Sequence, residues 1–361
     1  MSRILPLLTT VLVVLACDDG SGPDREVPPD TEIIEVNDGL QVTTVARDLQ
    51  APWEVAFAAD RVFVTERDTG RVIELVDGQP VEIRHFDVNR AHEGGLLGLA
   101  PSPQFDDDRS LYAYMTTDED NRVIRFSVDD PDNAQVILSG IPSAAIHNGG
   151  RIAFGPDGHL WIATGDAGEP NLSQDPDSLA GKILRITADG EVPQDNPFDD
   201  SPVWALGLRN VQGLAWDGDG QLYATEFGPD VDDEVNRIVA GQNYGWPDVT
   251  GRADQPSYAD PLFVRQPPEA SWSGATFLVD GSIDAWEGNL FVAALRGNRL
   301  WRLELSDDGQ QVVDTEQLLT QWGRLRQAVQ APDGSLWVLT NNRDGRGNPA
   351  EGDDRILRIG P

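Results

Sequence analysis

Six stretches of the chain repeat one pattern of apolar and polar positions. In each, a short apolar strand leads into a turn rich in Asp and Gly, and a second strand with aromatic or aliphatic residues follows. The second strands are anchored at Val62, Leu111, Leu160, Leu222, Leu290 and Leu336. A third strand with a basic residue often follows, as at 70–76, 121–128, 181–186, 298–305 and 354–359.

Repeats of about 40–50 residues that each hold several strands are typical of β-propellers. The anchors lie at comparable intervals, and long helical patterns are scarce. The sequence therefore predicts an all-β fold, a six-bladed β-propeller with four-stranded antiparallel blades, over residues 34–361. A β-sandwich is the alternative, but it does not explain a phrase that recurs six times.

The third repeat places a base beside a carboxylate. If its turn is centred between Pro156 and Asp157, positions whose numbers sum to 313 face each other. His147 and Asp166 are then cross-strand neighbours, with Cβ atoms about 5 Å apart. Such a carboxylate orients an imidazole and stabilises its charged form. On these two residues alone, an ion pair at the surface is the simpler interpretation.

The ends of the six hairpins should meet at one mouth of the central channel. In an antiparallel pair, the residue before the first strand and the residue after the second lie at the same end. That mouth would collect a half-ring of arginines, namely Arg209 (next to Asn210), Arg296, Arg324 and Arg326, opposite Glu93, His147 and Asp166. The half-ring suits an anionic planar cofactor. Pairing of these arginines with local Asp and Glu between blades explains them equally well.

The charge of the chain restricts its partners. With 61 acidic and 27 basic residues, the formal net charge is −34, which argues against nucleic acid and anionic membranes. The acidic segment 226–236 offers oxygen ligands that suit calcium, although it lacks EF-hand spacing and an acidic loop is the alternative. No HxH or HxxxH pair occurs, so a zinc or iron site is not expected.

The N-terminus predicts export and lipid attachment. Residues 1–17 have the pattern of a signal peptide, with Arg3 before an apolar stretch and an ending that resembles a bacterial lipobox. Cys17 is the only cysteine, and we expect it to carry the lipid. Residues 18–33 are acidic and rich in Pro and Gly, which predicts a flexible linker. The expected location is periplasmic or cell-surface, with membrane contact only through Cys17.

Several motifs resemble the glucose/sorbosone dehydrogenase family, which includes soluble quinoprotein glucose dehydrogenases and aldose sugar dehydrogenases. The resemblance runs in order from about Trp53 to Ile359. The motifs that carry it are EGGLLGLAPSPQF (93–105), HNGGRIAFGPDGHLWIATGDAG (147–168), GKILRITADGEVPQDNPF (181–198), LGLRNVQGLAW (206–216), EFGPDVDDEVN (226–236), GQNYGWP (241–247) and GRLRQAVQAPDGSLWVLT (323–340). The resemblance implies a six-bladed propeller that uses pyrroloquinoline quinone (PQQ) and calcium.

The resemblance also implies catalytic roles for three residues. His147 matches the general base, which takes the proton of the sugar's anomeric hydroxyl while hydride passes from C1 to the quinone. Asp166 matches the carboxylate that orients this histidine and stabilises its imidazolium form. Arg209 matches the arginine that stabilises negative charge on the quinone oxygen.

Five further residues match positions that contact the cofactor. Asn210 matches a residue that hydrogen-bonds it, and Arg324 and Arg326 match the pair that grips its carboxylates. Arg296 stands where glucose dehydrogenases have a lysine. Glu93 replaces a glutamine near substrate and cofactor, and a carboxylate there is expected to raise a neighbouring pKa or to repel an anionic quinone.

Two calcium sites follow from the resemblance. Main-chain oxygens of Gly228 and Pro229 match the ligands of a calcium ion that the cofactor also binds. Glu234 and Tyr244 match positions at a second, structural calcium ion.

Taken together, these features predict PQQ- and calcium-dependent oxidation of aldose sugars at C1 to the lactone, by a monomer that passes electrons to an unidentified acceptor. One alternative is a non-catalytic, calcium-stabilised propeller that binds a sugar or a protein partner, which Glu93 and Arg296 favour. A second alternative is a lactonase-type hydrolase. It needs three or four carboxylate or Asn ligands around the axis, and the arginine half-ring argues against it.

Overall fold

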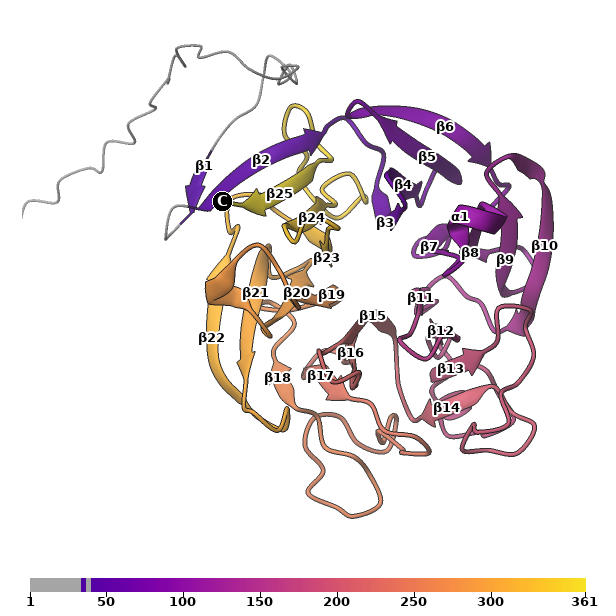
Figure 1. The fold of residues 1–361 in the computed structure, drawn as a ribbon. Coiled ribbons are helices and arrows are strands. Elements are labelled where there is room, and N and C mark those ends of the chain that lie inside the picture. Colours follow the sequence, from indigo (N-terminus) through magenta and orange to yellow (C-terminus); the bar gives the residue numbers. More distant parts are fainter. Residues whose placement is uncertain (1–33, 37–39) are drawn as a thin grey trace, which may run out of the picture. The chain divides into compact units, whose positions relative to one another are not determined.

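Six antiparallel sheets stand in a ring (Figure 1) in the computed structural model, which describes residues 34–36 and 40–361. The predicted six-bladed β-propeller is thereby confirmed. The predicted signal peptide 1–17, the proposed lipid site at Cys17 and the linker 18–33 lie outside the described residues.

Blades one to three follow one another along the chain, and the first strand of each lies nearest the centre of the ring (Figure 1). Their strands are β3 (Pro52–Ala58), β4 (Arg61–Glu66), β5 (Arg71–Val76) and β6 (Gln79–His85); β7 (Leu96–Pro101), β8 (Ser110–Thr116), β9 (Asn121–Ser127) and β10 (Asp130–Ile141); and β11 (Ile152–Phe154), β12 (Leu160–Ala163), β13 (Lys182–Ile186) and β14 (Val203–Leu206).

Blades four to six repeat this order. Their strands are β15 (Val211–Trp216), β16 (Leu222–Glu226), β17 (Asp233–Arg237) and β18 (Phe263–Arg265); β19 (Trp272–Phe277), β20 (Leu290–Ala294), β21 (Arg299–Leu305) and β22 (Val312–Leu318); and β23 (Leu325–Gln330), β24 (Leu336–Thr340) and β25 (Ile356–Gly360), joined by β2 (Leu40–Ala46) and β1 (Ile34–Val36). All six predicted anchor residues lie in the second strand of a blade.

The ring is closed by the first and last parts of the described chain. β2 pairs antiparallel with β25, so blade six takes its outer strands from the N-terminal side. This pairing completes the sheet of blade six and thereby closes the ring. The repeat pattern did not single out residues 40–46, whose hairpin partner β1 has only three residues.

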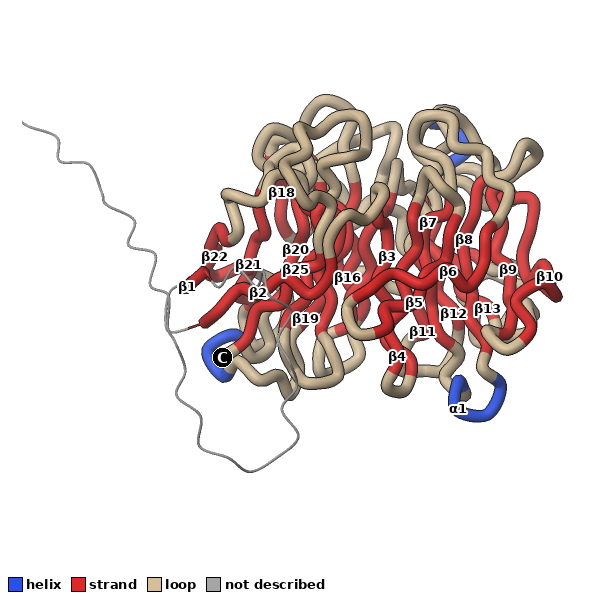
Figure 2. Tube along the Cα trace, turned by 90° about the horizontal axis from the view of Figure 1, so that it is seen from above, coloured by secondary structure: helices blue, strands red, loops and turns tan. Residues whose placement is uncertain are grey.

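Helical structure is limited to three short segments among the described residues. They are α1 (Phe105–Asp108) and two 3₁₀ turns, η2 (Pro170–Ser173) and η3 (Asp284–Trp286). No helix in the described part of the chain is long and apolar enough to cross a membrane. Loops project from both faces of the ring (Figure 2).

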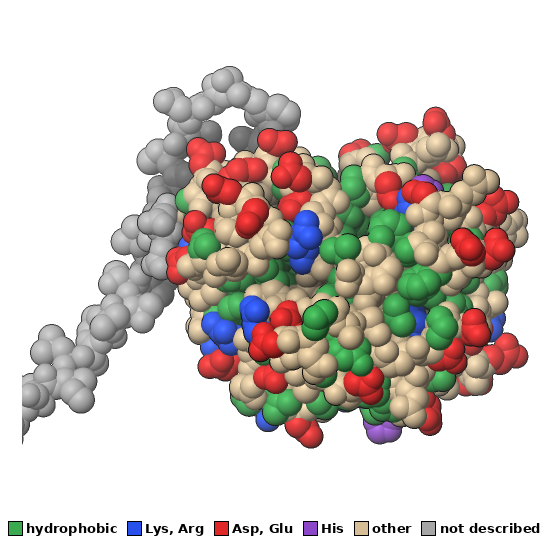
Figure 3. Space-filling model, turned by 90° about the horizontal axis from the view of Figure 1, so that it is seen from below, with side chains coloured by type: hydrophobic (Ala, Val, Ile, Leu, Met, Phe, Trp, Pro, Cys, Tyr) green, Lys and Arg blue, Asp and Glu red, His purple; other side chains and the backbone are tan. Residues whose placement is uncertain are grey.

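Each blade is packed against its neighbours by apolar side chains. Between blades two and three, for example, Tyr114, Ile162 and Leu184 are fully buried in one cluster. Burying one such side chain contributes about 1.5–3 kcal/mol, so these interfaces stabilise the ring. Acidic side chains are scattered over the face seen in Figure 3, where few basic ones appear.

The axis of the ring is filled by a buried polar network. Glu54 of blade one forms an ion pair with Arg151 of blade three and accepts a hydrogen bond from Gln327 of blade six. Arg151 also donates from Nε to the carbonyl of Gln212 at 2.9 Å and stacks on the Trp53 ring, with Cζ 4.1 Å from its centroid. These bonds join blades one, three, four and six at the centre.

The pH dependence of stability should report on Glu54. Burial raises its pKa from about 4.5 to about 7, although Arg151 opposes the shift. Between these values the folded protein keeps a proton that the unfolded chain releases, so stability falls as pH rises. We expect the ionisation of Glu54 to lower the free energy of unfolding by about 3 kcal/mol as the pH rises between these two pKa values. The Glu54→Gln variant should lack that loss. Urea unfolding at pH 5 and pH 8 measures it, and equal pH slopes for both proteins would refute it.

Candidate functional site

One mouth of the channel opens into a cavity of about 420 Å³. All six blades contribute to its wall, as expected for the ends of antiparallel hairpins that meet at one rim. Every predicted site residue lines this cavity except Asp166, Glu234 and Tyr244; those that do are Glu93, His147, Arg209, Asn210, Gly228, Pro229, Arg296, Arg324 and Arg326.

His147 is oriented by a buried carboxylate. Its Nδ1 lies 2.6 Å from Oδ1 of Asp166, which is fully buried. Asp166 also accepts hydrogen bonds from the Gly168 N–H at 2.8 Å and from Trp246 Nε1 at 2.8 Å. Burial raises the pKa of Asp166, but His147 and these donors outweigh it, so the pKa lies below its usual value. With Nδ1 bound to Asp166, Nε2 is the nitrogen left to act as a base.

The register of the His147 hairpin differs from the prediction by one residue. Paired positions in β11 and β12 sum to 314, as in Ile152 with Ile162. The turn is wider than expected, since the N–H of Gly155 bonds to the carbonyl of His159 and centres the loop on Asp157. The backbone neighbour of His147 is therefore Ala167, whose N–H donates to the His147 carbonyl at 3.1 Å. Asp166 still reaches the imidazole through its side chain.

Arg209 and Asn210 enter the site before β15. The Asn210 Oδ1 accepts the Gly149 N–H at 3.0 Å and so fixes the segment that carries His147. Arg209 donates from Nη1 to the Phe227 carbonyl at 3.1 Å, and its Cζ lies 5.4 Å from the Trp246 ring centroid. Its buried Nε has no hydrogen-bond partner among the described residues. Burial lowers the pKa of Arg209.

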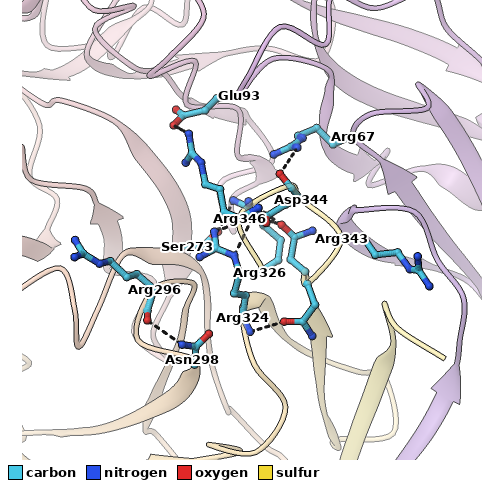
Figure 4. A network of polar contacts seen from close by, with 12 residues as sticks. Arg67, Glu93, Ser273, Arg296, Asn298, Arg324, Arg326, Arg343, Asp344 and Arg346 are labelled. Carbon is cyan, nitrogen blue, oxygen red and sulfur yellow. Dashed lines mark hydrogen bonds and ion pairs between the residues drawn. The ribbon is translucent and has the colours of Figure 1, made fainter. Parts of the chain in front are cut away.

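The arginines fall into two groups, those with a carboxylate partner and those without one. Arg324 is paired with Asp344 at 2.7 Å (Figure 4), as expected of a structural ion pair. Within the described chain, Arg209, Arg296 and Arg326 have no such carboxylate partner. The site therefore holds cationic charge that its own acidic residues do not neutralise.

Arg326 is the most constrained of these cations. It is 4% exposed and binds only neutral acceptors, with Nη1 2.7 Å from Gln212 Oε1 and Nη2 3.0 Å from Asn341 Oδ1. Burial, reinforced by the nearby Arg67, lowers its pKa to about 9. A buried guanidinium without a counter-ion is costly, and an anion in the cavity would stabilise it.

Glu93 has two hydrogen-bond partners that the sequence analysis did not assign to it. Its Oε2 accepts the backbone N–H of His147 at 2.9 Å, and its Oε1 accepts Arg346 Nη2 at 3.0 Å. Burial raises the pKa of Glu93, but the His147 N–H and Arg346 outweigh it and the pKa lies below its usual value. The expected repulsion of an anion was derived without Arg346, whose charge balances that of Glu93.

Gly228 and Pro229 lie in the cavity wall beside an unpredicted carboxylate. Asp233, also in the wall, accepts the Gly228 N–H at 2.8 Å and the Ser271 N–H at 2.6 Å. Burial raises its pKa to about 6. Carboxylate and carbonyl oxygens are the ligands that calcium prefers. Within the described residues, no group of three or more His, Cys, Asp or Glu side chains is arranged to hold a metal ion.

Glu234 and Tyr244 are buried and do not line the cavity. Half of the predicted acidic loop 226–236 is strand, because Asp233–Arg237 forms β17 and pairs Glu234 with Glu226 on β16. Burial raises the pKa of both glutamates. Tyr244 donates its hydroxyl to the Arg237 carbonyl at 2.7 Å. A calcium ion at Glu234 and Tyr244 stays a prediction.

Four residues of the site were not assigned a role from the sequence. Trp246 holds Asp166, Gln212 holds Arg326, Asp233 binds the Gly228 loop, and Arg346 holds Glu93. Trp246, Gln212 and Asp233 all lie in motifs quoted above, so the motifs were a signal that could have found them. Arg346 lies outside the quoted motifs, and its contact with Glu93 joins two blades through residues far apart in the sequence.

Comparison with known proteins matches residues 49–357 to the family model for glucose/sorbosone dehydrogenases. The aldose sugar dehydrogenase YliI of Escherichia coli is 29% identical, over 85% of this chain and 91% of that protein. Quinoprotein glucose dehydrogenase B of Acinetobacter calcoaceticus is 34% identical over 60% of this chain and 54% of that protein. The PQQ-bound structure of aldose sugar dehydrogenase from Streptomyces coelicolor has a TM-score of 0.82 and 41% identity, covering 92% of this chain and 99% of that one.

Proposed function

The chain belongs to the glucose/sorbosone dehydrogenase family, and we propose that it is a quinoprotein that oxidises aldose sugars at C1 with PQQ as its cofactor. The observation that carries the proposal is the composition of the cavity wall. A histidine oriented by a buried carboxylate and arginines without carboxylate partners face the same space. The first removes a proton, and the second hold an anion.

The cavity suits a planar polycarboxylate such as PQQ. Arg326 has only amide and hydroxyl acceptors, and the buried Nε of Arg209 has none among the described residues. Carboxylates of a bound quinone would supply the missing acceptors for Arg326 and, with Asn210, Arg296 and Arg324, would fix its orientation. Arg209 would face negative charge on the quinone.

The residues around the cavity then have distinct tasks. When bound, the quinone accepts the hydride that leaves C1 of the sugar. His147 Nε2 takes the proton of the anomeric hydroxyl, and the product is the lactone. Asp166 holds the Nδ1 proton and stabilises the imidazolium that results, while Trp246 and Gly168 keep Asp166 ionised. The guanidinium of Arg209 stabilises negative charge that develops in the cavity.

Calcium completes the proposal. Gly228 and Pro229 would supply main-chain oxygens in the cavity wall, where the buried Asp233 adds negative charge nearby. A second calcium ion at Glu234 and Tyr244 is a further proposal. We also propose that the protein is an exported monomer, lipid-anchored through Cys17, that passes electrons to an acceptor not yet identified.

Reconstitution tests the function directly. Metal-free protein is mixed with PQQ and calcium, and reduction of an artificial electron acceptor is followed with a panel of aldoses. We expect sugar-dependent reduction that requires the quinone. Absence of reduction with every sugar, together with absence of quinone binding by absorption spectroscopy, would eliminate the proposal.

The two alternatives lose support from particular contacts. The non-catalytic interpretation relied partly on Glu93, and Arg346 balances that charge. The lactonase-type interpretation needs carboxylate or Asn ligands on the axis, where Glu54 is engaged with Arg151 instead. Quinone binding without sugar oxidation in the reconstitution would revive the first.

A further inference from the structure

His147 holds a backbone conformation that its residue type rarely adopts. Its φ of 57° lies in the left-handed region, which costs a non-glycine residue about 1–2 kcal/mol. Three contacts hold it there, made by the Ala167 N–H at 3.1 Å, by Asp166 at 2.6 Å and by Glu93 at 2.9 Å. Ala167 and Asp166 follow β12 in the same blade, whereas Glu93 precedes β7 in blade two.

Glu93 is in turn held by a distant part of the chain. Arg346, 253 residues further on, lies in the loop between β24 and β25 of blade six and points toward Glu93 (Figure 4). Blades six and two are not adjacent, because blade one lies between them (Figure 1). The Arg346 side chain is 57% exposed and that of Glu93 19%, so the pair stands at the rim of the cavity.

The loop that carries Arg346 is held by contacts with blades one and six. Asp344 accepts Arg324 at 2.7 Å, and its carbonyl accepts Arg67 Nη2 at 3.4 Å. Arg343 donates from Nε to the Asp353 carbonyl at 2.6 Å. Arg346 is therefore presented from an anchored base, although its own side chain is open to solvent.

The charge of Glu93 makes this chain of contacts effective. Because its pKa lies below the usual value, Glu93 is a carboxylate that accepts from both the His147 N–H and Arg346. Without Arg346, the His147 N–H alone would have to hold the Glu93 carboxylate against the attraction of other cations of the cavity, such as Arg209. The contact of the left-handed turn at His147 with blade two would then weaken.

We propose that Arg346 is a positioning residue, which by holding Glu93 keeps the backbone of His147 in the orientation that sugar oxidation needs. The proposal rests on the proposed function for its kinetic consequence. It requires no contact between Arg346 and the sugar or the quinone.

Steady-state kinetics of the reconstituted protein test the role. We expect Arg346→Ala to lower kcat about tenfold, less than the ~10²-fold that a misplacement of 1 Å can cost, with KM for the sugar and quinone affinity nearly unchanged. Arg346→Lys should restore part of kcat, because it keeps a cationic donor. Arg358→Ala is the control, since this arginine of the same blade pairs with Asp333 at 3.0 Å and does not line the cavity.

A double-mutant cycle separates action through Glu93 from direct binding. In Glu93→Gln the charge that Arg346 neutralises is gone, so adding Arg346→Ala should change kcat by less than about twofold. If Arg346→Ala weakens quinone binding equally in the wild-type protein and in the Glu93→Gln variant, Arg346 binds the cofactor directly and the proposal is wrong.

Hydrogen–deuterium exchange gives a measurement that needs neither quinone nor sugar. In the cofactor-free protein, Arg346→Ala should accelerate exchange in peptides that contain the His147 amide, and Arg358→Ala should not. Unchanged exchange together with unchanged kcat would overturn the proposal. If wild-type protein oxidises no sugar yet exchange responds as expected, the proposed function fails while the positioning of His147 by Arg346 holds.

Discussion

Replacing His147 with alanine is expected to abolish sugar oxidation and leave the quinone bound. Proton transfer by a positioned base contributes about 10²–10⁴-fold to a rate, so kcat should fall by at least the lower figure. The imidazole is the only group of this hairpin that combines a position on the cavity wall with a buried carboxylate at its second nitrogen. Quinone affinity should change little, because the arginines remain.

His159 provides the matched control for this experiment. It belongs to the same hairpin but lies at the opposite turn, where its Nδ1 is 3.4 Å from Asp157. His159→Ala should keep wild-type kcat and KM. Both variants are followed with the same dye assay, and quinone content is checked by absorption. Appreciable turnover by His147→Ala would show that another group removes the proton.

Replacing Arg326 with glutamine is expected to weaken quinone binding about 10²-fold, because truncating one partner of a buried charge pair costs about 2–5 kcal/mol. The same change should raise the stability of the cofactor-free protein. Burial and neighbouring cations lower the pKa of Arg326 to about 9, so its charge opposes folding at neutral pH when no anion is present. Affinity and stability would thus move in opposite directions.

Titration calorimetry with PQQ and thermal unfolding of the cofactor-free protein measure the two effects. Arg358→Gln is a suitable control, since Arg358 lies on β25 and pairs with Asp333 at 3.0 Å outside the cavity. Arg324→Ala should also weaken binding, but it leaves Asp344 without its partner and therefore should not stabilise the protein. Unchanged quinone affinity in Arg326→Gln would place the cofactor elsewhere.

The order of the blades and the membership of the cavity wall follow from local sequence. Each hairpin carries its own strand pattern and turn residues, and the chain has six of them. Antiparallel pairing then determines which ends share a face, and this brought His147, Arg209, Arg296 and Arg326 to one cavity. A repeated local pattern is enough for these conclusions, because a propeller is built of similar units that pack in order.

The working arrangement of the site was decided by the tertiary structure. A turn wider by one residue put Ala167, not Asp166, opposite the His147 backbone. Ring closure brought the loop of blade six to Glu93 and so placed the charge of Arg346 beside that carboxylate. Which arginines have a carboxylate partner was likewise set by contacts between loops far apart in sequence. A strand pattern specifies local pairing, whereas these contacts depend on the path of each loop across the ring, which no periodicity encodes.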